Sequence, residues 1–215
     1  MRALLQKQFP ARGISVAPVL SICGPSCSGK SSTARALAAE YPTYIEIPEE
    51  NPYLRALVED STTFDAMANQ MWFLRRMGDF IKDADSYRPM VLDQDPSAIV
   101  FVYARIFRDE FRISDSDYVR LTEELKQVEE KLQQWSSPRK VLVLDAPAEM
   151  LHARAVQRLK PGCAPPVEWF VKIRTYFQEF SRSLPKKLVL STADTDPLEV
   201  IAMARRLIRS GDRPA

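Results

Sequence analysis

The sequence predicts a three-layer α/β protein built around a five-stranded parallel sheet. Short apolar runs alternate along the chain with longer segments whose apolar residues recur at helical spacing. The runs contain no alternating polar residues, which is typical of strands covered by helices on both faces of a parallel sheet. The length of 215 residues suits one such domain, and 46% hydrophobic with 27% charged residues is an ordinary globular composition.

Composition and charge exclude several classes of protein. Lysine and arginine number 30 against 28 acidic residues, a balance that argues against a nucleic-acid-binding or membrane-binding surface. The 3 cysteines, Cys23, Cys27 and Cys163, are too few for a disulfide scaffold, and a single histidine, His152, provides no usual zinc site. No apolar run is long enough to span a membrane. We therefore expect a cytoplasmic protein.

The predicted elements follow one another in alternating order. Residues 1–15 are expected to be an N-terminal extension, and residues 16–210 to form the single domain. Apolar or β-branched runs predict strands over residues 16–23, 43–47, 90–92, 141–144 and 187–190. Helical spacing predicts helices over residues 31–41, 64–81, 118–135, 148–159, 170–180 and 197–209.

One predicted helix carries an apolar seam from Tyr118 to Trp135, at alternating steps of three and four residues. Two heptads are too few to predict a coiled coil. The seam is expected to pack either on the domain itself or on a second subunit, so a homodimer is one of two interpretations.

A glycine-rich motif directly follows the first strand. Gly24-Pro25-Ser26-Cys27-Ser28-Gly29-Lys30-Ser31 matches the phosphate-binding P-loop pattern, and the strand before it and helix after it give the required context. Its main-chain N–H groups are expected to surround phosphate oxygens, with Lys30 at the β- and γ-phosphates and Ser31 on Mg²⁺. This predicts the P-loop NTPase fold, with ATP bound by Gly24, Pro25, Ser26, Cys27, Ser28, Gly29, Lys30, Ser31 and Ser32. We interpret Cys27 as a small filler rather than a reactive thiol.

Glu46 lies at the end of the second predicted strand, beside the expected phosphate site. Ligands gather at the carboxyl ends of parallel strands, and a carboxylate there can accept a proton from an attacking hydroxyl. The alternative for Glu46 is a solvated carboxylate at a strand end.

From Glu46 through Asn51-Pro52, and again at Gln70-Met71-Trp72-Phe73-Leu74, the chain resembles the bacterial deoxynucleoside kinases of the deoxyadenosine and deoxyguanosine kinase type. These are P-loop kinases with thymidylate-kinase-like relatives, and Ile47 replaces their usual proline. The resemblance implies that Glu46 is the catalytic base and that Gln70 contacts a nucleobase. Tyr53 and Arg76 are the other residues expected to bind the substrate.

A third motif of that family, Asp/Glu-Arg-Ser after a strand, corresponds here to Asp93-Gln94-Asp95. Asp93 is expected to join Ser31 as a Mg²⁺ ligand, because hard cations prefer oxygen ligands. Gln94 replaces the family arginine, and Met77 replaces another that is expected seven residues after Gln70. Both departures affect the acceptor side rather than the ATP side.

Arg154 and Arg158 are spaced for one face of a helix, within a segment, 154–166, that resembles the lid of these kinases. The resemblance implies that they clamp the transferring phosphate, and the alternative is a pair of solvated arginines. Asp194 lies in a loop that resembles the adenine-contacting loop. Asp145 is interpreted as a turn or cap residue, and His152 as a helix-surface residue.

Together these features predict an ATP- and Mg²⁺-dependent phosphotransferase. It is expected to move the γ-phosphate to a hydroxyl of a small molecule, most simply a nucleoside or analogue. One alternative is a nucleoside monophosphate kinase of thymidylate type, which would need a cationic pocket from Arg75, Arg76 and Arg105. The other is a nucleotide-binding regulatory module without transfer activity.

Overall fold

The computed structural model describes residues 17–54, 63–86, 88–133, 139–159, 163–185 and 187–210. The predicted extension over residues 1–15 lies outside them, as do Trp135 of the predicted seam and residues 160–162 of the predicted lid. In the described part, no helix is long and apolar enough to cross a membrane.

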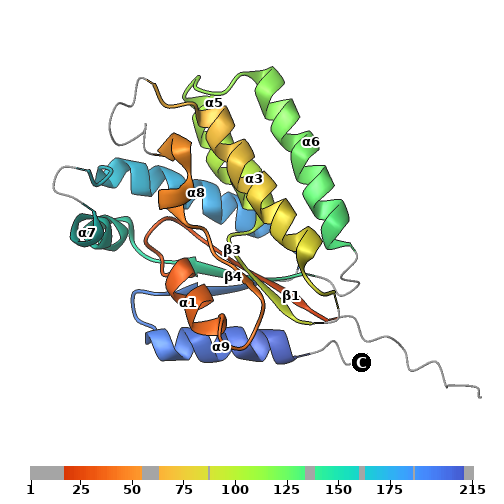
Figure 1. The fold of residues 1–215 in the computed structure, drawn as a ribbon. Helices are drawn as coiled ribbons and strands as arrows, with labels where there is room; N and C mark the ends of the chain where they lie inside the picture. The colour runs from red at the N-terminus through yellow and green to blue at the C-terminus, as the bar shows by residue number, and fades with distance from the viewer. Residues whose placement is uncertain are drawn as a thin grey trace, which may run out of the picture.

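Among the described residues, one parallel sheet of five strands lies at the centre of the molecule, in the order β2-β3-β1-β4-β5 (Figure 1). The predicted α/β class and parallel sheet are therefore confirmed. The central strands β1 and β3 are buried along their whole length because helices cover both of their faces. The bounds of the strands are Val19–Cys23 for β1, Thr43–Tyr44 for β2, Met90–Asp93 for β3, Lys140–Asp145 for β4 and Lys187–Ser191 for β5.

The edge strand β2 is shorter than the predicted 43–47. Only Thr43 and Tyr44 pair with β3, opposite Val91 and Leu92. The chain then leaves the sheet, and a 3-10 turn, η1 (Pro48–Glu50), follows. Glu46 consequently lies in a loop beyond the strand, on the side where β1 and β3 also end.

Helices cover both faces of the sheet, which confirms the three layers (Figure 1). On one face α1 (Lys30–Leu37) and α9 (Pro197–Arg209) pack on β1 and β4 through a buried core that includes Leu37, Leu142 and Val200. On the other face lie α3 (Ala66–Asp83), α6 (Asp115–Leu132) and α8 (Val167–Ser183). The helix α7 (Ala148–Arg158) follows β4.

The apolar seam of α6 is buried inside the chain. Leu121, Leu125, Val128 and Leu132 are buried in the same core cluster as Leu74 of α3. The two helices lie side by side in Figure 1 and pack closely along their lengths. Of the two interpretations of this seam, packing on the domain itself is therefore the one that the described residues support.

Sequence reasoning assigned no element between β3 and α6, yet this segment is helical. It begins at Asp95, whose side chain accepts the N–H of Ser97, and Pro96 suits the first turn because it needs no donor there. The short helix α4 (Pro96–Ala98) continues into a π-helical segment, η2 (Ile99–Ala104), and then α5 (Arg105–Asp109). Such π-helical turns are frequent at functional sites.

Candidate active site

The P-loop connects β1 to α1, as its sequence context predicts. At Gly24 a Cβ atom would lie 2.0 Å from the carbonyl oxygen of Leu144, so no other residue fits without moving β4. Gly29 has room for a side chain, but its φ of +99° lies in the left-handed region that favours glycine. Gly24, whose φ is +146°, is thus required for both steric and conformational reasons, and Gly29 for its conformation.

Lys30 is the first residue of α1 and is only 8% exposed. Its Nζ donates a hydrogen bond to the carbonyl of Pro25 at 3.1 Å, within the loop itself. Burial would lower the pKa of Lys30, but Tyr103, Asp93 and Glu46 together raise it above the usual value. Lys30 is therefore protonated at neutral pH, and acidic groups that stabilise its positive charge lie around it.

Two carboxylates stand beside this lysine, after neighbouring strands. Glu46 follows β2 and is half-buried, while Asp93 ends β3 and is fully buried. Burial, with the Asp93 charge as a smaller cause, raises the pKa of Glu46 to about 8, while Lys30 acts in the opposite direction. The pKa of Asp93 is also raised, chiefly by burial. This arrangement provides a carboxylate whose pKa lies near neutral pH beside a buried cation, as proton transfer requires.

Neither carboxylate oxygen of Asp93 has a well-formed hydrogen bond among the described residues, although both are buried. The Ser31 hydroxyl lies close enough to lower the pKa of Asp93 in part. A buried carboxylate without partners is costly unless a cation or donor reaches it. Ser31 and Asp93 therefore fit Mg²⁺ as an oxygen pair that a bound phosphate would complete.

The segment after Glu46 is held against α3 by two contacts. Asn51 is buried and donates from Nδ2 to Asn69 Oδ1 at 2.8 Å, and its own Oδ1 accepts the N–H of Tyr53. Arg76 donates to Glu50 at 2.9 Å. Gln70 is buried next to Asn69 on the same helix. The two parts of the chain that carry the predicted acceptor residues are thus brought together.

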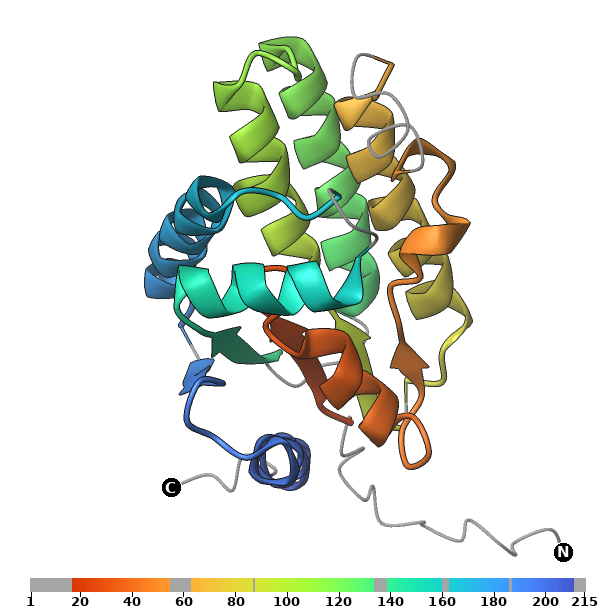
Figure 2. The same cartoon turned by 90° about the vertical axis from the view of Figure 1, so that its left-hand side faces the viewer.

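The predicted clamp arginines lie on α7, which crosses the face toward the viewer in Figure 2. Arg154 donates to the carbonyl of Thr192 at 2.7 Å and to that of Cys27 at 3.4 Å, so it joins the P-loop to the loop after β5. Arg158 is exposed. Both arginines act to lower the pKa of the Cys27 thiol, although burial raises it overall. Cations from α1 and α7 therefore surround the P-loop, and the thiol stays protonated, which agrees with Cys27 as a filler.

Asp194 is exposed in the loop that begins with Thr192. The N–H of Thr192 donates to the carbonyl of Asp145 at 2.7 Å. Asp145 itself accepts a two-pronged ion pair from Arg174, at 2.8 and 2.9 Å, and the N–H of Ala146. Asp145 is therefore a structural residue, as predicted, but it is the last residue of β4, paired with Ser191 of β5, rather than a turn or cap residue after the strand. Its carbonyl fixes the loop that carries Asp194.

Two predictions differ from the structure. His152 is half-buried rather than on the surface, and its Nδ1 hydrogen-bonds the carbonyl of Pro165 at 2.8 Å, because the chain after α7 folds back over it. Met77 is wholly buried in the core between α3 and α6. An arginine at position 77 would therefore place an unpaired charge in an apolar interior, and it could not reach a ligand in this packing.

The three arginines expected for an acceptor-phosphate pocket do not converge. Arg75 pairs with Glu124 on α6 at 3.6 Å, Arg76 pairs with Glu50, and Arg105 pairs with Glu179 on α8 at 2.9 Å. Each charge is thus satisfied by a carboxylate on a different element.

Sequence reasoning missed Tyr103, which belongs to η2. The hydroxyl of Tyr103 interacts with Ser26 and Gln94, and both contacts act to lower its pKa, although burial raises it overall. Its ring stacks edge-on against Phe177 of α8, with ring centroids 5.7 Å apart. No pattern marked this residue, since only the π-helical turn brings it beside Lys30 and Glu46.

Comparison with known proteins agrees with this geometry. Residues 19–178 match the AAA domain family. Three solved structures of deoxyadenosine kinase from M. mycoides resemble the chain. The one with bound dATP has a TM-score of 0.70 at 18% identity and covers 89% of this chain and 100% of that chain. The one with bound dCTP gives 0.69 at 18%, covering 90% and 100%, and the one with dCMP and dCDP gives 0.66 at 16%, covering 89% and 98%. No curated protein sequence matches the chain.

Proposed function

Because the chain belongs to the AAA domain family and has the fold of deoxyadenosine kinase, we propose that it is an ATP-dependent phosphotransferase acting on a nucleoside or nucleoside analogue. The reaction moves the γ-phosphate of ATP to a hydroxyl of the acceptor. One observation carries this proposal. Three residues lie close enough to shift one another's pKa values: Lys30 of the P-loop, Glu46 after β2 and Asp93 of β3. The lysine proposed to bind the phosphates of ATP therefore lies near the carboxylate proposed to accept the proton of the acceptor.

On the donor side, the main-chain N–H groups of residues 26–31 bind the phosphates of ATP, and Lys30 exchanges the Pro25 carbonyl for phosphate oxygens. Ser31 and Asp93 would hold Mg²⁺, which would supply positive charge at the phosphate oxygens. Arg154 and Arg158 add positive charge from α7, and Asp194 lies in the loop expected at the adenine.

On the acceptor side, Glu46 accepts the proton of the attacking hydroxyl. Its raised pKa makes it a stronger base than an ordinary carboxylate, while Lys30 limits the rise. Gln70, Tyr53 and Arg76 line the acceptor side, held in place by the Asn51–Asn69 hydrogen bond. The bound dCTP and dATP of the similar kinases support a nucleoside as the acceptor.

A nucleoside monophosphate kinase is the less favoured alternative. An acceptor phosphate needs cations that are free to bind it, whereas Arg75, Arg76 and Arg105 each bind a carboxylate on a separate element. A neutral acceptor needs no such group.

The test measures ATP consumption with nucleosides, deoxynucleosides, nucleoside monophosphates and simple alcohols, and identifies the product by its added phosphate. Glu46→Gln keeps the size of the side chain but cannot accept the proton, so kcat should fall by about 10²–10⁴-fold with little change in ATP affinity. Glu49→Gln, at an exposed position nearby, is the matched control.

Three outcomes would contradict this proposal. Transfer only to monophosphates would establish the rival kinase. Consumption of ATP that no acceptor stimulates would favour the regulatory module. A loss in Glu49→Gln rather than in Glu46→Gln would place the base elsewhere.

A further inference from the structure

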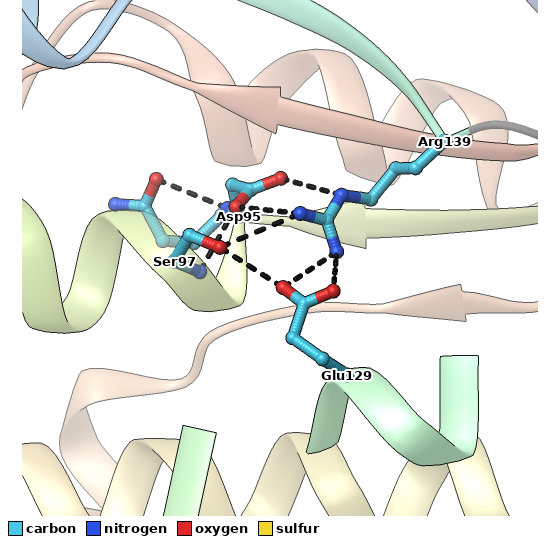
Figure 3. Close-up of polar contacts among 5 residues, drawn as sticks. Asp95, Ser97, Glu129 and Arg139 are labelled. Carbon is cyan, nitrogen blue, oxygen red and sulfur yellow. Dashed lines mark hydrogen bonds and ion pairs between the residues drawn. The ribbon is translucent and has the colours of Figure 1, made fainter. Parts of the chain in front are cut away.

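A network of charged side chains lies just after the end of β3 (Figure 3). Arg139 Nε lies 2.9 Å from Asp95 Oδ2, and Arg139 Nη1 donates to both oxygens of Glu129 at 2.9 and 2.8 Å. Ser97 Oγ donates to Glu129 at 2.9 Å. We call Asp95, Ser97, Glu129 and Arg139 the charged network.

The charged network is buried enough to be strong. The side chain of Asp95 is 0% exposed and that of Arg139 is 19% exposed. Burial would lower the pKa of Arg139, but Asp95 and Glu129 raise it overall. Removing one partner of such a pair leaves an uncompensated buried charge, so the geometry resists change.

The four residues come from three segments that lie far apart in the chain. Asp95 follows β3 and caps α4, which contains Ser97, while Glu129 belongs to α6 and Arg139 directly precedes β4. Asp95 also lies near the end of β1, since its charge, after burial, raises the pKa of Cys23. The charged network therefore ties the chain just after Asp93 to α6 and to the residue that precedes β4.

Gln94, between Asp93 and Asp95, has a φ of +98°. A left-handed backbone is strained for a non-glycine residue, and it persists where the surroundings enforce it. On one side the N–H of Gln94 donates to Ile22 at 2.9 Å, within the sheet. On the other side Asp95 is held by Arg139 and by its bond from the N–H of Ser97 at 2.9 Å.

We propose that the Asp95–Arg139 ion pair, supported by Glu129, is a positioning device for phosphoryl transfer. It holds Gln94 in the left-handed conformation and thereby fixes Asp93 beside Lys30 and Ser31. Its kinetic consequence rests on the proposed function. Misplacing a catalytic group by about 1 Å can cost about 10²-fold in rate, so a strained connection next to Asp93 needs such a restraint.

Asp95→Asn is the most informative variant. Asparagine still caps α4 but loses the ion pair, whereas Arg139→Met would leave Asp95 as a buried unpaired charge and endanger folding. We expect Asp95→Asn to lower kcat by about 10–100-fold while the KM for ATP changes by less than about threefold. Arg205→Met is the matched control, because it removes the Arg205–Glu40 pair far from β3 and should leave kcat within about twofold.

A second substitution tests the role of the strain. Glycine adopts a positive φ at little cost, so adding Gln94→Gly to Asp95→Asn should restore kcat by at least about fivefold. The wild type, Asp95→Asn, Gln94→Gly and the double variant are also compared by urea unfolding without nucleotide. We expect Gln94→Gly to raise the midpoint more in the wild-type background than in Asp95→Asn, because only the intact network enforces the strain.

The kinetic and unfolding results separate the two proposals. Wild-type kcat in a folded Asp95→Asn variant, equal effects of Gln94→Gly on kcat in both backgrounds, or additive unfolding midpoints would each overturn the positioning role. If the wild type transfers phosphate to no acceptor, the proposed function fails, while non-additive midpoints would still support the hold on Gln94.

Discussion

At the scale of single residues, the site depends on carboxyls held in an unfavourable environment. Glu46 and Asp93 both have raised pKa values, and neither oxygen of Asp93 has a good partner among the described residues. Such groups reduce stability in the absence of ligands, because ionised carboxyls are poorly solvated there. This is the expected compromise where a protein keeps reactive groups ready for substrate.

The pH dependence of stability follows from Glu46. Its pKa is about 8 in the folded protein against an ordinary 4.5, so between these values the folded state holds a proton that the unfolded state has lost. Stability therefore falls as pH rises through this window and becomes constant above it. Glu46→Gln carries no charge, so it should gain stability relative to wild type as pH rises.

Thermal unfolding at pH 5 and pH 9 measures this effect. We expect the midpoint of Glu46→Gln, relative to wild type, to be at least about 3 °C higher at pH 9 than at pH 5, since about 1 kcal/mol corresponds to about 2–4 °C at this size. Glu49→Gln, at an exposed position, should show no such trend. A difference that is the same at both pH values would contradict the raised pKa.

At the scale of elements, packing decides what the periodic patterns leave open. The seam of α6 predicts a buried face, but the same seam could bind α3 or a second subunit. Leu121 is buried and Val119, two residues before it on this helix, is exposed. The two residues therefore mark the face that packs on the domain and the face that remains open to solvent. The Arg154 bond to Thr192 likewise joins α7 to the loop after β5, a contact that no local pattern specifies.

The packing of α6 gives a direct prediction. Leu121→Ala should destabilise the protein by about 2–5 kcal/mol because it leaves a cavity in the core. Val119 is 55% exposed, so Val119→Ala should change the free energy of unfolding by no more than about 0.5 kcal/mol. The unfolding midpoint should not depend on protein concentration, and a rise with concentration would indicate instead that the helix packs on a second subunit.

At the scale of the whole molecule, the proposed ATP site would couple the P-loop, β3 and α7. The groups proposed to hold the nucleotide come from all three, so a bound nucleotide should stabilise the complete fold rather than one loop. At about 100 times its Kd, a ligand adds about 2.7 kcal/mol of stability.

We therefore expect Mg²⁺ with ATP to raise the unfolding temperature by about 5–10 °C. Lys30→Ala should remove most of this shift, since it loses the charge at the β- and γ-phosphates while the main-chain donors remain. An equal shift in wild type and Lys30→Ala would show that the nucleotide binds elsewhere.

The sequence by itself determined the strands, the P-loop and the positions of Glu46 and Asp93. Each rests on a local pattern: an apolar run that must be buried, glycines that a tight turn requires, or a polar residue at a strand end. The resemblance to deoxynucleoside kinases is confirmed at the level of the fold. Even so, β2 is shorter than its apolar run, because only two residues pair with β3.

Only the tertiary structure decided which distant side chains meet. Tyr103 of the π-helical segment η2 contacts Ser26 of the P-loop, and Arg139 reaches Asp95 although β1 separates β3 from β4 in the sheet. Met77 looked like a missing ligand contact and is a core residue. The physical reason is the same in each case. Periodicity specifies which face of an element is buried, but the partner of a charge or ring depends on packing between segments far apart in the chain.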